Sequence, residues 1–132
     1  AFLATGHISP EESLILCREG RKRGVNMILT HPEFPRTRIG RDDQAELAKL
    51  GVVIEKNWFN LAQKSVMPEE MAETIRTVGS GHVYLATDRG QKGAPTPVSE
   101  LKRFIAVMLT CGIAEAQIRD MVQKVPEEVV CR

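Results

Sequence analysis

Several features of common protein classes are missing from this sequence of 132 residues. No apolar run approaches the roughly 18 residues that a membrane span needs, and the charged-then-apolar pattern of a signal peptide does not appear in these residues. The chain has neither a glycine-rich phosphate loop nor the Gly-x-Ser-x-Gly turn of serine hydrolases. The net charge is only +1, aromatic residues make up 5%, and basic residues are not interleaved with them. We therefore expect neither a membrane nor a nucleic acid as a partner.

Cysteine is scarce as well. The three cysteines are an odd number without Cys-x-x-Cys spacing, and Cys17 and Cys111 fall within helical patterns. This use of cysteine is typical of reduced thiols, and it indicates a cytoplasmic protein. A length of 132 residues and an apolar content of 42% predict one globular domain, residues 1–132.

Four short apolar runs stand out because a polar residue with possible chemistry follows each one. These residues, at nearly equal intervals, are His7, His31, Glu55 and Asp88. Such runs are typical of buried strands of a parallel sheet, and each polar residue then lies at the carboxyl end of its strand. His82 precedes its strand instead, so we expect it at the opposite end in a structural role.

Helical patterns separate the four runs. They begin near Pro10, Asp42, Pro68, Pro97 and Ala114, and the first has Ser9 and Glu12 placed for a capping box. Residues 56–67 carry no such pattern and are expected to be irregular. The alternation predicts an α/β fold of four βα units with an extra C-terminal helix. We expect half of a TIM-type (βα)8 barrel, because a barrel directs all four strand ends to one axis, and an open flavodoxin-like sheet is the alternative.

The strand ends carry ligands that suit a borderline divalent metal. We expect His7, His31 and Asp88 to bind zinc, with manganese or iron as alternatives, and Asp88 to exchange protons with an activated water. Glu55 fits three roles equally well: ligand, acid–base group, or salt-bridge partner of Lys56. Glu55, Lys56, Trp58 and Arg89 are our candidates for a substrate pocket, and the loop arginines favour a small anionic substrate.

Three of these segments resemble a known family. Thr5-Gly6-His7, Leu29-Thr30-His31-Pro32 and Ala86-Thr87-Asp88-Arg89-Gly90 resemble the last four strands of the amidohydrolase superfamily, metal-dependent hydrolases built on (βα)8 barrels. In that family the fifth and sixth strands each give a metal-binding histidine, and the eighth gives an aspartate that binds metal and shuttles protons. The resemblance assigns these roles to His7, His31 and Asp88. It also implies that a proline-containing turn, here Val125-Pro126, ends the fold.

The family's paired histidines on the first strand and its fourth-strand ligand have no counterpart here. Since the chain also opens inside a strand, we expect it to be the C-terminal half of a longer barrel, completed by the missing N-terminal half or by a second copy in a homo-oligomer. The expected activity is hydrolysis of a C–N, ester, lactone or phosphoester bond. A metal-dependent decarboxylase and a non-catalytic half-barrel that binds ligands or partners are the alternatives.

Overall fold

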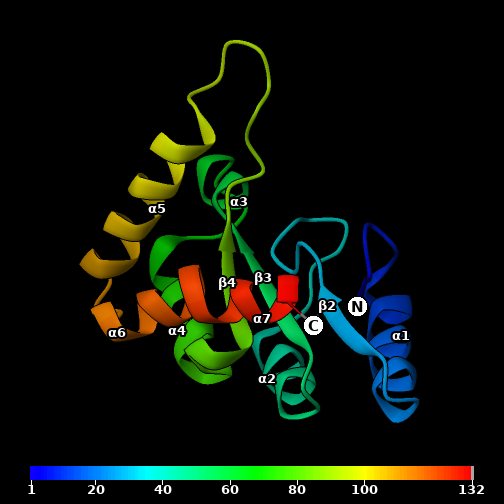
Figure 1. Cartoon of the computed structure of the whole chain (residues 1–132). Coiled ribbons are helices and arrows are strands. Elements are labelled where there is room, and N and C mark those ends of the chain that lie inside the picture. The colour runs from blue at the N-terminus through cyan, green and yellow to red at the C-terminus, as the bar shows by residue number, and fades with distance from the viewer. Residues whose placement is uncertain (132) are drawn as a thin grey trace.

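The computed structural model describes residues 1–131. Its centre is one sheet of four parallel strands whose spatial order follows the chain, β1-β2-β3-β4. The strands are β1 (Phe2–Ala4), β2 (Asn26–Leu29), β3 (Val53–Asn57) and β4 (Val83–Ala86). Helices follow the strands in alternation, which confirms the predicted α/β fold (Figure 1).

Helices begin at or next to all five predicted starts, and further short helices form between and after them. They are α1 (Pro10–Lys22), α2 (Arg41–Lys49), α3 (Trp58–Ala62), α4 (Pro68–Val78), η1 (Ser80–His82), α5 (Pro97–Thr110), α6 (Glu115–Arg119), η2 (Asp120–Lys124) and α7 (Val125–Cys131). At the start of α1 the Glu12 amide donates to Ser9 Oγ at 3.2 Å, and the Ser9 amide donates to Glu12 Oε2 at 3.0 Å. This capping box satisfies two amide groups that a helix start leaves open. Within residues 1–131 no helix has both the length and the apolar character needed to cross a membrane.

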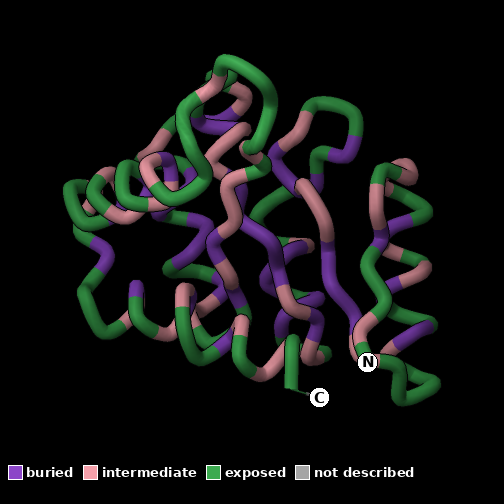
Figure 2. Tube along the Cα trace, turned by 45° about the horizontal axis from the view of Figure 1, so that its top comes forward, coloured by how far each residue is buried: buried purple, intermediate pink, exposed green. Residues whose placement is uncertain are grey.

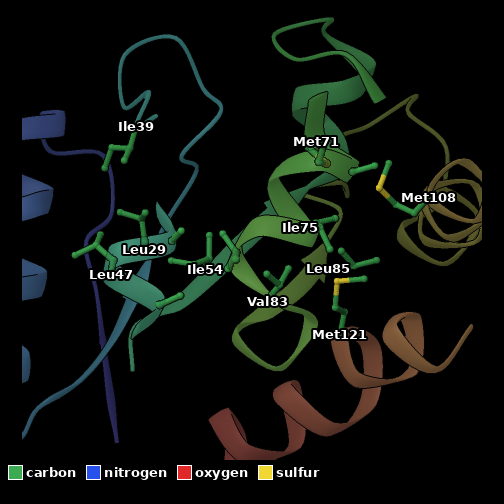
Figure 3. Close-up of a cluster of buried hydrophobic side chains, with 14 of the residues drawn as sticks. Leu29, Ile39, Leu47, Ile54, Met71, Ile75, Val83, Leu85, Met108 and Met121 are labelled. Atoms are coloured by element: carbon green, nitrogen blue, oxygen red, sulfur yellow. The ribbon is translucent and has the colours of Figure 1, made fainter. Parts of the chain in front are cut away.

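One face of the sheet is covered by helices. Leu29 pairs in register with Ile54, and Ile54 with Val83, so these side chains point to the same face. They pack with helix residues in a continuous apolar core (Figure 3), which includes Leu47, Met71, Ile75, Met108 and Met121. Figure 2 shows the buried residues along the central strands and the exposed ones on the outward sides of the helices. The strand order explains this arrangement, because crossovers of one hand between successive neighbours place their helices on the same face.

The opposite face of the sheet is less covered. It carries Ala4, Ile28, Val53 and Tyr84, of which Ala4 is exposed and Val53 and Tyr84 are half-buried. Ile28 is buried but lies outside the main core cluster. We call these four residues, together with Glu55, which pairs in register with Tyr84, the open face.

Two details differ from the sequence-based expectation. Glu55 lies in the middle of β3 rather than beyond its end, because the strand continues to Asn57. Asn57 then caps α3, a helix within the stretch expected to be irregular, by accepting the Phe59 amide at 2.9 Å.

The expected turn at Val125-Pro126 is helical instead: η2 and α7 continue α6 to Cys131. Pro126 lies inside this continuous helical segment, and its ring has no N–H to donate to the preceding turn. The wide turn of η2, in which the Val125 amide reaches Asp120 O, ends just before it.

Candidate functional site

A hollow of about 190 Å³ lies at the carboxyl ends of the strands. Its walls are His7, His31, Phe34, Phe59 and Asp88. His7, His31, Phe59 and Asp88 each follow the end of a different strand by two or three residues. The fold therefore brings together the three residues expected to bind metal, and it adds two phenyl rings as apolar walls.

The two histidines stack on each other. Their ring centroids are 5.1 Å apart and the ring planes differ by 22°. Phe34, a residue that sequence reasoning missed, lies 6.4 Å from the His31 ring in a tilted arrangement. The His31 ring thus contacts both an imidazole and a phenyl ring.

The backbone at these positions adopts a conformation that most residues avoid. His31 has φ 49° and Asp88 has φ 51°, and Gly6, directly before His7, has φ 64°. Left-handed backbone at a non-glycine residue costs about 1–3 kcal/mol, and residues in such conformations cluster at functional sites. In residues 1–131 only Lys64 is a further non-glycine residue with positive φ.

The His31 carbonyl holds its strained loop in place. It accepts the Thr37 hydroxyl at 2.6 Å and the Phe34 amide at 3.0 Å. The strained conformation is therefore fixed from the loop side, and it turns the imidazole toward the sheet rather than into solvent: only 12% of the His31 side chain is exposed.

Glu55 faces His31. Its Oε1 lies 3.6 Å from His31 Nδ1, a buried nitrogen that has no hydrogen bond. Both carboxylate oxygens of Glu55 are occupied, Oε1 by the side-chain amide of Asn57 at 2.8 Å and Oε2 by the hydroxyl of Tyr84 at 2.9 Å. Burial, followed by the charge of Glu55, raises the pKa of Tyr84, so this hydroxyl keeps its proton and donates it.

Lys56 points to the other face of the sheet, since neighbouring residues of a strand alternate. It is fully buried, and its ammonium group donates to Glu33 and to Gln44 Oε1, the latter at 2.6 Å. Lys56 thus pairs with Glu33 instead of Glu55, and it does not line the hollow. Burial lowers the pKa of Lys56, and the charge of Glu33 opposes that shift.

Trp58 and Arg89, the other pocket candidates, lie beside the hollow. Both donate to Glu100 of α5, a carboxylate that is only 2% exposed; the Arg89 Nε distance is 3.2 Å. The guanidinium carbon of Arg89 also lies 5.6 Å from the centroid of the Phe59 ring. These contacts tie the segment after Asp88 to α3 and α5, and they leave Arg89 near the hollow's edge.

A larger hollow, of about 470 Å³, lies elsewhere, between the loop after β2, the start of α2, and α4. Arg38 pairs with Glu70 there at 3.1 Å, and Glu33 and Gln44, the partners of Lys56, also line it. It receives no residue from the ends of β1 or β4. We place the candidate chemistry in the smaller hollow, where side chains from all four strand ends meet.

The donors at the smaller hollow are of the right type for a divalent metal: two imidazoles and a carboxylate. His31 Nδ1 is buried without a hydrogen bond, and the polar atom beside it is Glu55 Oε1 at 3.6 Å. In the described part of the chain, however, no three His, Cys, Asp or Glu side chains are close enough together to hold an ion by themselves. His7, His31 and Asp88 thus share a hollow and have the donor types of a metal site, but they are not close enough together to form one among the described residues.

Residues 1–55 match one family model. Its description is a family of unknown function (DUF6282). The match includes β1, β2 and the start of β3, and with them His7, His31 and Glu55. Neither a curated protein nor a solved structure matches the chain.

Tyr84 and Phe34, which the sequence analysis did not identify, left only a weak signal in the sequence. Tyr84 is the second residue of its strand, and its alternation with Val83 and Leu85 puts it on the face away from the core. In a parallel sheet of unknown register this does not identify Glu55 as its neighbour. Phe34 lies in an irregular loop, where no periodicity indicates which side chain turns inward.

Proposed function

We propose that this chain is the C-terminal half of an amidohydrolase-like, metal-dependent hydrolase on a TIM-type barrel. The observation that carries the proposal is the shared hollow of His7, His31 and Asp88 at the carboxyl ends of the strands. Active sites of (βα)8 barrels lie at this end. The strand order without reversal also favours a barrel over a flavodoxin-like sheet, whose binding site requires a switch in strand order.

In this proposal His7 and His31 bind a divalent ion, zinc in the first instance, and Asp88 works beside them. The chemistry that such an ion supplies when bound is water activation, which brings the pKa of the water to about 7. Asp88 accepts the proton of the attacking water and returns it to the leaving group of a C–N, ester, lactone or phosphoester bond. Phe34 and Phe59 exclude water from the apolar part of a small substrate, and Arg89 attracts its anionic group.

The open face supports the proposal that this chain is half of a barrel. Apolar side chains of Ile28, Val53 and Tyr84 occupy what would be a barrel interior, and β1 and β4 are the outer strands of the sheet in residues 1–131. Four further βα units would cover this face and pair with both edges. They are supplied by a preceding segment of the same polypeptide or by a second copy, and they bring the remaining metal ligands. The odd cysteine count supports a cytoplasmic location for such an enzyme.

Metal analysis tests the proposal. Because the described residues supply only part of the ligand set, we expect weak but saturable zinc binding in a fixed ratio when the protein is dialysed against excess Zn²⁺, and loss of this binding in His31→Ala. His82→Ala is the matched control, because His82 is an exposed histidine at the opposite ends of the strands. Retention equal in all three proteins, or a folded wild type without zinc, would overturn the proposal in favour of a non-catalytic module.

A further inference from the structure

We infer that Glu55 is a positioning residue for His31: it holds the Nδ1 side of the imidazole and so leaves Nε2 as the nitrogen available to an ion. This inference rests on the proposed function, because it assigns the metal-facing atom of a proposed ligand. The juxtaposition of a buried carboxylate with a buried, unbonded ring nitrogen carries it. Glu55 itself is only 7% exposed.

Glu55 is fixed from two directions before it meets His31. Asn57, two residues along β3, donates to Oε1, and Tyr84, its register neighbour on β4, donates to Oε2. The Asn57 side chain in turn accepts the amide of Phe59, a wall of the hollow. The carboxylate is therefore part of the sheet's own framework and stands as a rigid acceptor beside the ring.

The chemistry of imidazole then selects the tautomer. A neutral histidine has one ring N–H donor and one acceptor nitrogen, and a carboxylate can only accept. With Oε1 3.6 Å from Nδ1, the favourable tautomer carries its proton on Nδ1 and points it at Glu55. Metal-binding histidines commonly use their second nitrogen in this way, which fixes the ring and raises its basicity as a ligand.

The arrangement also accounts for a buried carboxylate on the open face. Glu55 does not pair with the neighbouring Lys56, whose side chain is committed to Glu33 on the covered face. The histidine ring within reach of Glu55 is that of His31. Asn57 and Tyr84 offset part of the cost of burying this carboxylate, and the unbonded Nδ1 of His31 is the further polar atom beside it.

The first measurement is the tautomer of His31 in the metal-free protein, read from the ring-nitrogen shifts of ¹⁵N-histidine-labelled samples above the titration range of histidine. We expect the proton on Nδ1 in the wild type and a mixture of tautomers in Glu55→Ala. Glu55→Gln keeps an acceptor oxygen and should keep the wild-type tautomer. A wild-type proton on Nε2, or no change in Glu55→Ala, would overturn the inference.

The second measurement is Zn²⁺ affinity by calorimetric titration. Loss of an outer partner of a metal-binding histidine weakens binding by about 10- to 100-fold, and we expect that loss in Glu55→Ala with near-complete rescue in Glu55→Gln. Glu46→Ala, at an exposed glutamate of α2, is the matched control. Zn²⁺ binding that is equal in wild type and Glu55→Ala refutes the positioning role. A wild type without Zn²⁺ binding but with the expected tautomer refutes only the proposed function.

Discussion

Two neighbouring residues of β3 carry buried charges to opposite faces of the same sheet. Lys56 meets Glu33 and Gln44 beneath the helices, whereas Glu55 meets Asn57, Tyr84 and His31 on the open face. The first cluster contains a buried lysine–carboxylate pair, and Glu33 and Gln44 also line the larger hollow. The second borders the smaller hollow through His31. Each contains a buried polar atom without a hydrogen bond, Glu33 Oε2 in the first and His31 Nδ1 in the second. The difference is therefore the partner of the carboxylate: a lysine in the first cluster and a histidine of the candidate site in the second.

Breaking the Lys56 cluster should have the largest effect on stability. In Lys56→Met the Glu33 carboxylate stays buried without its cation, a loss that typically costs about 3–5 kcal/mol. Urea denaturation followed by circular dichroism measures it. Lys49→Met, at an exposed lysine of α2, should cost almost nothing, and the double variant Lys56→Met/Glu33→Leu should recover much of the loss. A single-variant cost below about 1 kcal/mol would refute the structural role of this pair.

The sequence predicted the framework because its signals are local. Ser9 with Glu12, and the prolines at 10, 68 and 97, determine helix starts through contacts within one turn, so they could be recognised without a structure. The strand ends at His31 and Asp88 were recognisable for the same reason. The partners of Lys56 were not, because Glu33 and Gln44 reach it from a loop and a helix whose positions depend on tertiary packing. Glu55 was placed at a strand end because its apolar run stops there, yet β3 continues through two polar residues that both find partners.

The next largest effect compares apolar side chains on the two faces. Ile54 is fully buried in the core, while its neighbour Val53 is half-buried on the open face. We expect Ile54→Ala to cost about 3 kcal/mol and Val53→Ala less than about 1 kcal/mol in the same denaturation experiment. If Val53→Ala approaches the cost of Ile54→Ala, the open face is covered in solution. Light scattering then shows whether a second copy covers it.

A pH measurement tests how completely the covered face excludes water. Burial raises the pKa of the Cys17 thiol from its ordinary value of 9.0 to about 11. Between these pH values the unfolded chain releases a proton that the folded chain keeps, so the stabilising contribution present below pH 9 is lost as the pH rises. Wild type should therefore lose more stability from pH 8.5 to 10.5 than Cys17→Ala. Cys131→Ala, at an exposed cysteine, should follow the wild type.

A small stability effect should also come from removing one hydroxyl group on the open face, in Tyr84→Phe. The change removes the hydroxyl that donates to Glu55 Oε2, but the half-buried position allows water to replace it. We expect a loss of about 1 kcal/mol. The matched variant on the covered face is Gln44→Leu, which deprives the fully buried Lys56 of an acceptor and leaves Ile39 O without its side-chain donor, so it should cost more. Equal losses in urea denaturation would contradict the difference between the two clusters, because Gln44→Leu removes several hydrogen bonds of buried groups whereas Tyr84→Phe removes one at a half-buried position.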